Sequence, residues 1–214
     1  MRRGPFSYHR AMSEPQAVAT EVDEIAPGVW HWHLQDERIN FVGSAHAVRD
    51  EQGVVLIDPL PLVPEALESL GPVEAIALTT SSHQRSSWRL RRELGVRVHA
   101  PAAVKQVDEE PDVRYSEGDR LPGGLLAIFT PGAGTFQHSL LLEREGGVLF
   151  TPDLFARPPG APLMLLPAEF MHDPEQARRT AEELLGYDFS ILCTGHGEPV
   201  VEDAKGALRA ALEG

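Results

Sequence analysis

One strand pattern occurs twice in this chain, and this repeat constrains the fold more than any other feature. Gln52–Pro59 reads QGVVLIDP and Gly146–Asp153 reads GGVLFTPD, so each apolar strand ends at an aspartate beside a proline. Ala75–His83 (AIALTTSSH) and Ser190–Gly197 (SILCTGHG) also match, because each strand breaks at threonine and a histidine follows shortly after. A helical segment separates the two strands of each half. The repeat predicts two related strand–helix–strand–helix halves.

Other segments complete the predicted set of strands and helices. Residues 53–57 form a strand that is too apolar to have a solvated face, so we expect it inside a sheet. Residues 87–94 have the apolar spacing of a helix. Gly28–Leu34 (GVWHWHL) alternates like a strand, which places His31 and His33 on one face. Two histidines spaced this way can ligate a metal, but solvent-exposed imidazoles on an early strand are the simpler interpretation.

Length and charge limit the classes of protein to consider. The chain has 214 residues, which suits one domain, and we assign that domain to residues 21–214. The net charge of −13 would repel nucleic-acid phosphates, and no apolar run approaches the roughly 20 residues of a membrane helix. The single cysteine, Cys193, excludes an internal disulfide and fits a reducing compartment. We therefore expect a cytoplasmic protein with neither a nucleic-acid nor a membrane partner.

The N-terminal segment differs from the rest of the chain. Residues 1–20 are polar, contain proline and show no periodicity, so we expect a disordered tail. Arg2 and Arg3 resemble the start of an export signal, but no apolar segment follows them. Met12 is a second candidate for the start of the chain.

Polar side chains from both halves stand at the ends of the predicted strands. Parallel strands bind ligands beyond their carboxyl ends, so residues of the two halves should line a shared cleft. The first candidates are Asp58, Thr80, Ser82, His83, Asp153 and His196.

Four motifs resemble the metallo-β-lactamase fold superfamily along most of the chain. APGVWHW is similar to the opening strand of that family, and GVVLIDP to its first aspartate motif. VLFTPD is similar to the strand that carries its metal-bridging aspartate, and ILCTGHGEP to the strand that ends in its last histidine. The resemblance implies an α+β or α/β fold, a four-layer αββα sandwich of two related halves. It also implies two metals at the strand ends.

Most residues at the family's metal-ligand positions differ in this chain. Its His-x-His-x-Asp-His signature corresponds to residues 80–85, and its later Pro-Gly-His motif appears as TPGAG. The ligand positions in these two stretches hold neither histidine nor aspartate but Thr80, Ser82, Gln84, Arg85 and Ala133. Only Asp153 and His196 match the family's ligands.

Two ligands are too few for a zinc site, because a catalytic zinc has three protein ligands and a structural zinc has four. Hydroxyl groups are poor zinc ligands, and Arg85 brings a positive charge into the cavity. We therefore expect no metal cofactor, with the Arg85 guanidinium in place of the ion and paired with Asp153. The predicted cleft lining is Asp58, Thr80, Ser82, His83, Gln84, Arg85, Ala133, Asp153 and His196.

Two other histidines could complete a three-ligand site for zinc, iron or manganese with Asp153 and His196. His83 is one position away from the family's second histidine, and on an extended backbone this shift turns it to the opposite side. His138 precedes a strand near Ala133 and could turn inward. Surface or hydrogen-bonded histidines are the alternative interpretation of both residues.

These observations leave two main hypotheses for function. One is a non-zinc, metallo-β-lactamase-like relative, a pseudoenzyme candidate whose cleft binds a small molecule. The alternative is a metal-dependent hydrolase that cleaves an ester, thioester or lactone at an atypical site around Asp153 and His196. A third hypothesis makes Cys193 a nucleophile with His196 as its base. Its place in an apolar strand is more typical of a buried cysteine that fills space.

The proline-rich segment Leu154–Phe170 (LFARPPGAPLMLLPAEF) has an apolar centre, unlike a solvated loop. Such a segment can pack under the final helices, cover the cleft or form a self-association surface. We expect a homodimer contact here.

Overall fold

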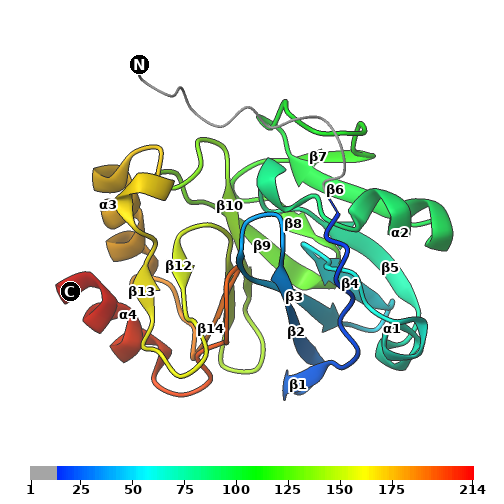
Figure 1. The fold of residues 1–214 in the computed structure, drawn as a ribbon, viewed down its shortest axis with the longest axis horizontal. Helices are drawn as coiled ribbons and strands as arrows, with labels where there is room; N and C mark the ends of the chain where they lie inside the picture. Colours follow the sequence, from blue (N-terminus) through cyan, green and yellow to red (C-terminus); the bar gives the residue numbers. More distant parts are fainter. Residues whose placement is uncertain (1–13) are drawn as a thin grey trace.

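The computed structural model describes residues 14–214, which form four layers (Figure 1). Helices α1 (Pro64–Leu70) and α2 (Ser87–Leu94) lie on one side, and α3 (Pro174–Leu184) and α4 (Ala204–Glu213) lie on the other. Two β-sheets lie between these helix pairs. The prediction of a four-layer αββα sandwich is confirmed.

The first sheet contains seven strands whose spatial order follows the order of the chain. The strands are β1 (Asp23–Ala26), β2 (Val29–Asp36), β3 (Phe41–Arg49), β4 (Val54–Ile57), β5 (Val73–Ala77), β6 (Arg97–Pro101) and β7 (Val113–Tyr115). Neighbours from β1 to β4 pair antiparallel, and neighbours from β4 to β7 pair parallel.

The second sheet contains five strands in the order β14, β11, β10, β9, β8. The strands are β8 (Arg120–Leu121), β9 (Leu125–Phe129), β10 (His138–Leu142), β11 (Val148–Thr151) and β14 (Ile191–Thr194). Strands β11 and β14 pair parallel, and the other neighbours pair antiparallel. Strands β12 (Phe155–Ala156) and β13 (Met164–Leu165) form a separate hairpin. A short 3₁₀ turn, η2 (Pro122–Gly124), joins β8 to β9.

The repeated sequence pattern corresponds to a repeated structural unit. Strand β4, helix α1 and strand β5 form one strand–helix–strand unit with parallel strands, and β11, α3 and β14 form another. Asp58 follows β4 and Asp153 follows β11, while His83 and His196 come after β5 and β14. Parallel strands bring their carboxyl ends to one edge of a sheet. Each half therefore places one aspartate and one histidine at the edge of its own sheet where the parallel strands end.

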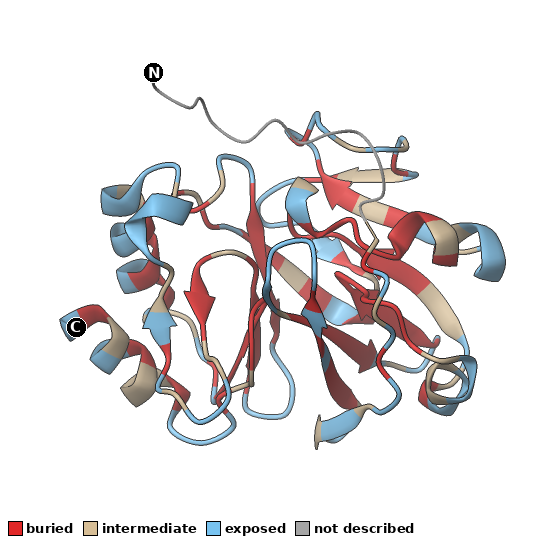
Figure 2. Cartoon of the chain, in the orientation of Figure 1, coloured by how far each residue is buried: buried red, intermediate tan, exposed pale blue. Residues whose placement is uncertain are grey.

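Buried apolar residues form three cores. Figure 2 shows the buried residues along the strands and on the helices. The core between the sheets contains residues of both, among them Val55, Leu140 and Phe150. Helices α1 and α2 pack on the first sheet through side chains such as Leu70 and Trp88, and α3 and α4 pack on the second sheet. All residues of β4 and β11 are buried, as their apolar sequences predict.

Part of the segment that we predicted to be a disordered tail contacts the domain. Ala19 is buried, and its backbone N–H donates to the Pro61 carbonyl at 2.9 Å. The Val63 N–H in turn donates to the Ala19 carbonyl at 2.9 Å. Residues 1–13, including Met12, lie outside the described part of the chain.

No helix in residues 14–214 has the length and apolar character needed to cross a membrane. The cytoplasmic location stays a prediction. The segment Leu154–Phe170 includes the β12–β13 hairpin and a 3₁₀ turn, η3 (Ala168–Phe170). Leu163 is buried in the core of the second sheet and its helices, whereas Met164 and Phe170 are exposed. This segment therefore packs partly under the final helices, and the homodimer contact stays a prediction.

The two histidines of β2 differ in exposure. His33 is exposed, as expected, but His31 is buried, and their rings stack at 5.4 Å between centroids. His46 lies opposite His31 in the register of β2 and β3 and is also buried. The expectation of a solvent-exposed imidazole is wrong for His31, because the backbone of Gly197 contacts this ring and β3 supplies a second imidazole beside it.

Candidate metal centre

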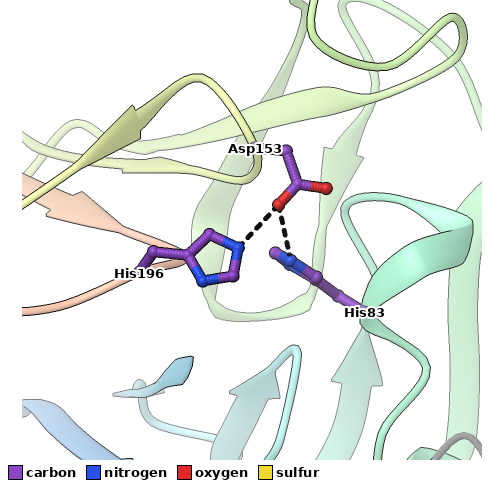
Figure 3. A group of neighbouring side chains, drawn as sticks. All are labelled: His83, Asp153 and His196. Carbon is purple, nitrogen blue, oxygen red and sulfur yellow. Dashed lines mark hydrogen bonds and ion pairs between the residues drawn. The ribbon is translucent and has the colours of Figure 1, made fainter. Parts of the chain in front are cut away.

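Three side chains from different strand ends converge at one edge of the sandwich (Figure 3). The Nε2 atoms of His83 and His196 each lie 2.9 Å from Asp153 Oδ1. One ligand atom from each residue lies within 4.8 Å of the others, a geometry that could hold a metal ion. Both histidines are buried, while the Asp153 side chain is 22% exposed. The group therefore meets solvent at Asp153.

His83 reaches this group because the chain turns soon after β5. Residues Ser81–His83 form a 3₁₀ turn, η1, rather than an extended segment. On an extended backbone, where neighbouring side chains point to opposite sides, His83 would turn away from the cleft, although the predicted lining and the three-ligand alternative both include it. The helical turn of three residues instead carries His83 round to face Asp153, the orientation that the three-ligand alternative requires.

Asp58 is buried behind His83 and orients its ring. Asp58 Oδ2 lies 3.0 Å from His83 Nδ1. Thr79 donates to the same carboxylate, from its backbone N–H to Oδ1 at 2.8 Å and from its hydroxyl to Oδ2. Asp58 is 4% exposed and does not line the pocket described below. It therefore acts on the site through His83.

His196 is fixed from behind in a similar way. Its Nδ1 lies 3.0 Å from the Val42 carbonyl oxygen, and its Nε2 faces Asp153. Ser44 on β3 fixes the loop that carries this histidine: its hydroxyl donates to the Gly197 carbonyl at 2.6 Å and accepts from the Gly197 N–H at 2.9 Å. Residues of the first sheet thus position His196, a candidate metal ligand that follows strand β14 of the second sheet.

The hydrogen-bond partners of the two rings determine where their lone pairs point. The Asp58 carboxylate and the Val42 carbonyl can only accept, so each Nδ1 carries a proton. A neutral ring protonated on Nδ1 has its lone pair on Nε2. Both Nε2 atoms face one Asp153 oxygen, which is also an acceptor. A positive species, either protons on the rings or a metal ion, is needed to stabilise these acceptors at such short distances.

The titration of Asp153 and His83 reflects the same contacts. Burial raises the pKa of Asp153, but the charges of His83 and His196 and their hydrogen bonds outweigh it and hold the pKa well below its ordinary value. Burial and the nearby Arg85 lower the pKa of His83, yet the contacts with Asp153 and Asp58 raise it by more, so the pKa lies above its ordinary value. Asp153 is therefore an anion at neutral pH, as a metal ligand must be.

Hydroxyl groups occupy the side of Asp153 away from the imidazoles. Ser82 Oγ donates to Asp153 Oδ2 at 2.7 Å, and Thr80 Oγ1 lies 3.2 Å from Ser82 Oγ. These two residues stand at the family's first two histidine positions. Ser82, with Thr80 beside it, holds the second carboxylate oxygen, which leaves Oδ1 to the histidines.

A pocket of about 480 Å³ opens beside Asp153. Its walls come from residues 80–82, 104–106 and 133–136. Of the predicted lining residues, the pocket is lined by Thr80, Ser82, Ala133 and Asp153. Three of these are positions where the family's ligand has been replaced. The small side chains there therefore open space next to the His–Asp–His group.

Arg85 does not pair with Asp153, which corrects our prediction. Its guanidinium is buried and donates to three backbone carbonyls: Ser44 at 2.5 Å, Asp58 at 3.0 Å and Gly195 at 3.2 Å. Asp153 is instead occupied by the two histidines and Ser82. Burial lowers the pKa of Arg85, and the more distant charges of Asp58 and Asp153 oppose this shift. Arg85 thus joins β3, β4 and the loop after β14, and it stabilises the junction of the two sheets.

Gln84 also points away from the pocket. Its Oε1 accepts from Trp88 Nε1 at 2.8 Å and from the Asp108 N–H at 2.6 Å, and its Nε2 donates to the Ser81 carbonyl at 2.9 Å. The amide that replaces the family's aspartate therefore ties α2 and residues 104–108 to the turn that carries His83. Predicting it as a lining residue placed it on the wrong side of this turn.

Two further candidates lie outside the His–Asp–His group. His138 on β10 is buried between aromatic rings, with centroid distances of 5.4 Å to Tyr115 and 5.3 Å to Phe129. Cys193 is fully buried within β14, and burial raises the pKa of its thiol. A buried, protonated thiol is a poor nucleophile, so the structure does not support the Cys193–His196 hypothesis.

Two stretches of the pocket wall, residues 104–106 and 134–136, were not predicted from the sequence. One signal was present for the first of these. Strand β6 pairs parallel with β5, so the residues that follow it reach the same edge of the sheet as Thr80 and His83.

Comparison with known proteins agrees with this architecture. A sequence model described as the metallo-beta-lactamase superfamily matches residues 25–211. No curated protein matches the sequence. Among solved structures, DIM-1 metallo-beta-lactamase is 13% identical, with a TM-score of 0.72 over 92% of this chain and 96% of that one.

Two other solved structures share the fold. A metallo-beta-lactamase from Pontibacter korlensis is 19% identical, with a TM-score of 0.69 over 90% of this chain and 98% of that one. The metallo-beta-lactamase FIM-1 from Pseudomonas aeruginosa, in its mono-zinc form, is 14% identical, with a TM-score of 0.68 over 94% of this chain and 97% of that one. With the sequence match over residues 25–211, these likenesses confirm the resemblance seen in the motifs: the chain belongs to the metallo-beta-lactamase superfamily.

Proposed function

We propose that the chain is a hydrolase that uses one divalent metal ion, held by His83, Asp153 and His196, to cleave a small ester, thioester or lactone. One observation carries the proposal: the Nε2 atoms of two imidazoles converge on one carboxylate oxygen, with each imidazole fixed from behind by an acceptor at its Nδ1. Three protein ligands match a catalytic zinc, and the same donor set suits iron and manganese.

The residues around the three ligands have the arrangement that supports metal binding in other sites. A metal-bound histidine usually donates its second N–H to a carboxylate or a backbone carbonyl, which fixes the tautomer. Asp58 does this for His83, and the Val42 carbonyl does it for His196. Ser82 holds the second oxygen of Asp153. The donor set therefore fits a metal ion without rearrangement of the tautomers.

The protein and the ion would contribute different parts of the chemistry. When bound, the ion supplies Lewis acidity and a nucleophile at neutral pH. The buried histidines keep solvent from the inner side of the site, and Asp153 faces the pocket where a substrate's carbonyl group would lie. The Ser82 hydroxyl lines the pocket but gives its one proton to Asp153, so towards a substrate it can act as an acceptor.

Metal replacement tests this proposal and separates it from the hypothesis of a metal-free binding protein. The full chain, stripped with chelator, is reconstituted with zinc, iron(II) or manganese and assayed with a panel of aryl esters, thioesters and lactones. We expect one of the ions to restore hydrolysis, and Asp153→Asn purified in parallel to remain inactive. Hydrolysis that is absent with every ion, or equal in Asp153→Asn, would contradict the proposal.

A further inference from the structure

The pocket beside Asp153 has one positively charged lining residue, Lys105. Lys105 is exposed and has no hydrogen-bond or ion-pair partner within the described residues. The chain has two lysines and a net charge of −13, yet two of the acidic residues that follow Lys105, Glu109 and Glu110, are engaged elsewhere. Glu109 pairs with Arg92, and Glu110 pairs with Arg114 at 2.8 Å. The ammonium group of Lys105 is therefore available to a ligand.

The loop that carries Lys105 is fixed on both sides of this residue. On one side, Arg114 of β7 donates to the Val104 carbonyl at 2.5 Å. On the other side, Gln84 accepts from the Asp108 N–H at 2.6 Å and donates to the Gln106 carbonyl at 3.4 Å. Because the backbone around Lys105 is held, less conformational entropy is lost when its side chain binds a ligand.

The rest of the pocket offers hydroxyl groups and an apolar surface. Thr80, Ser82 and Thr135 line it with hydroxyls. Val104 and Phe136 add apolar area, and the Phe136 ring is 44% exposed although it is large and hydrophobic. A volume of about 480 Å³ is within the range of small-molecule sites. Such a lining suits a small molecule with an apolar part and a polar end.

Charge determines the sign of that polar end. Asp153 is the one acidic residue of the lining, and it faces two histidines. A divalent ion at the proposed site outweighs the charge of Asp153, so the pocket then has net positive charge together with Lys105. A single ammonium in a pocket that also offers hydroxyl groups matches the one charge of a carboxylate better than the double charge of a phosphate monoester.

We infer that the pocket takes a small acyl compound that carries a carboxylate, and that Lys105 binds this carboxylate. The apolar part of the molecule would contact Phe136 and Val104. The inference rests on the proposed function in one respect: the carbonyl that reacts would lie at Asp153. The recognition of the anion by Lys105 can be tested without catalysis.

Binding of two probes of the same shape tests the inference. Phenylacetate and phenylacetamide differ in charge but little in size, and their affinities can be measured by calorimetry or ligand-observed NMR. The full chain is compared with Lys105→Ala, Lys105→Arg and Lys205→Ala, each with zinc and after chelation. Lys205 is the other lysine and lies on α4, so its variant removes the same charge away from the pocket.

We expect phenylacetate to bind at least about fivefold more tightly than phenylacetamide, which corresponds to roughly 1 kcal/mol. Lys105→Ala should abolish this preference, while Lys105→Arg and Lys205→Ala should retain it. Dependence on Lys105 is the decisive measurement, because a carboxylate bound at zinc alone would not need this residue.

Equal affinity for the two probes, no binding of either, or an unchanged preference in Lys105→Ala would overturn the inference. These outcomes are distinct from a failure of the proposed function. A chain that binds no metal but prefers phenylacetate through Lys105 refutes the hydrolase and supports the pocket assignment. A chain that shows metal-dependent hydrolysis, but whose preference for phenylacetate is unchanged in Lys105→Ala, supports the hydrolase and refutes the pocket assignment.

Discussion

His83 and Asp153 are in contact at 2.9 Å although they belong to different halves of the fold. His83 follows β5 of the first sheet, and Asp153 follows β11 of the second. Each residue also has a partner connected with its own half, since Asp58 contacts His83 and His196 contacts Asp153. The site therefore forms only where the two halves pack together, and its donors are positioned by both sheets.

Replacement of Asp58 should weaken metal binding without removing a ligand. In Asp58→Asn the amide can present its NH₂ group to His83 Nδ1, which disfavours the tautomer with a lone pair on Nε2. Substitutions of this kind typically reduce metal affinity by about 10–100-fold. Competition with a zinc-binding dye measures the effect.

An exposed aspartate provides the control for this variant. Asp188 is exposed on the surface beside Lys205, so Asp188→Asn removes the same charge and should bind metal like the unmodified chain. An affinity in Asp58→Asn equal to that of Asp188→Asn would show that Asp58 does not orient His83.

Arg85 should matter for stability rather than for ligand binding. Arg85→Ala leaves three buried carbonyls without their donor, and we expect it to reduce the free energy of unfolding by roughly 3 kcal/mol. Arg85→Lys should recover only part of this loss, because one ammonium cannot match the planar fork of the guanidinium. Urea denaturation of the three proteins gives the comparison. If Arg85→Ala is as stable as the unmodified chain, Arg85 does not join the two sheets.

His31 should make the fold less stable in mild acid. Burial, followed by the charge of His33, lowers the pKa of His31 from 6.5 to about 4. Between these values the unfolded chain binds more protons at this residue than the folded chain, so stability falls as the pH falls. The loss from pH 7 to pH 5 should be about 2 kcal/mol.

The variant His31→Gln tests this assignment, because glutamine cannot titrate. Urea unfolding at pH 7 and pH 5 gives the pH-dependent loss of stability for each protein. We expect a smaller loss in His31→Gln, whatever its stability at pH 7. Equal losses in the two proteins would mean that other groups cause the acid sensitivity.

The fold could be predicted from the sequence because it depends on the repeated pattern of apolar strands and helices. Two apolar strands that end at Asp58 and Asp153, each followed by a helix and a parallel strand, have few ways to pack. The same pattern placed His83 and His196 at one edge of the sandwich. What it could not give was the direction of side chains after the strands end, because there the backbone leaves the regular alternation of a strand.

Two errors in the predicted site, the placement of Gln84 and of Arg85, come from residues 81–85, where the chain forms a turn. The 3₁₀ turn directs His83 inward and Gln84 outward, the opposite of what an extended backbone would give. Arg85 adopts a left-handed conformation, with φ of 42°, that directs its side chain between the sheets. Asparagine, aspartate and glycine are the residues that usually indicate such a conformation, so an arginine gave no signal.

The metal content of the chain tests the central claim most directly. After dialysis against zinc and removal of the free ion, elemental analysis should find one ion per chain in the unmodified protein and in His172→Gln, which changes an exposed histidine. In His83→Gln the affinity should fall by about 100-fold or more, because a ligand is lost rather than one of its supports. An unmodified chain that retains no ion, or a His83→Gln variant that retains as much as the unmodified chain, would contradict a metal site built on His83, Asp153 and His196.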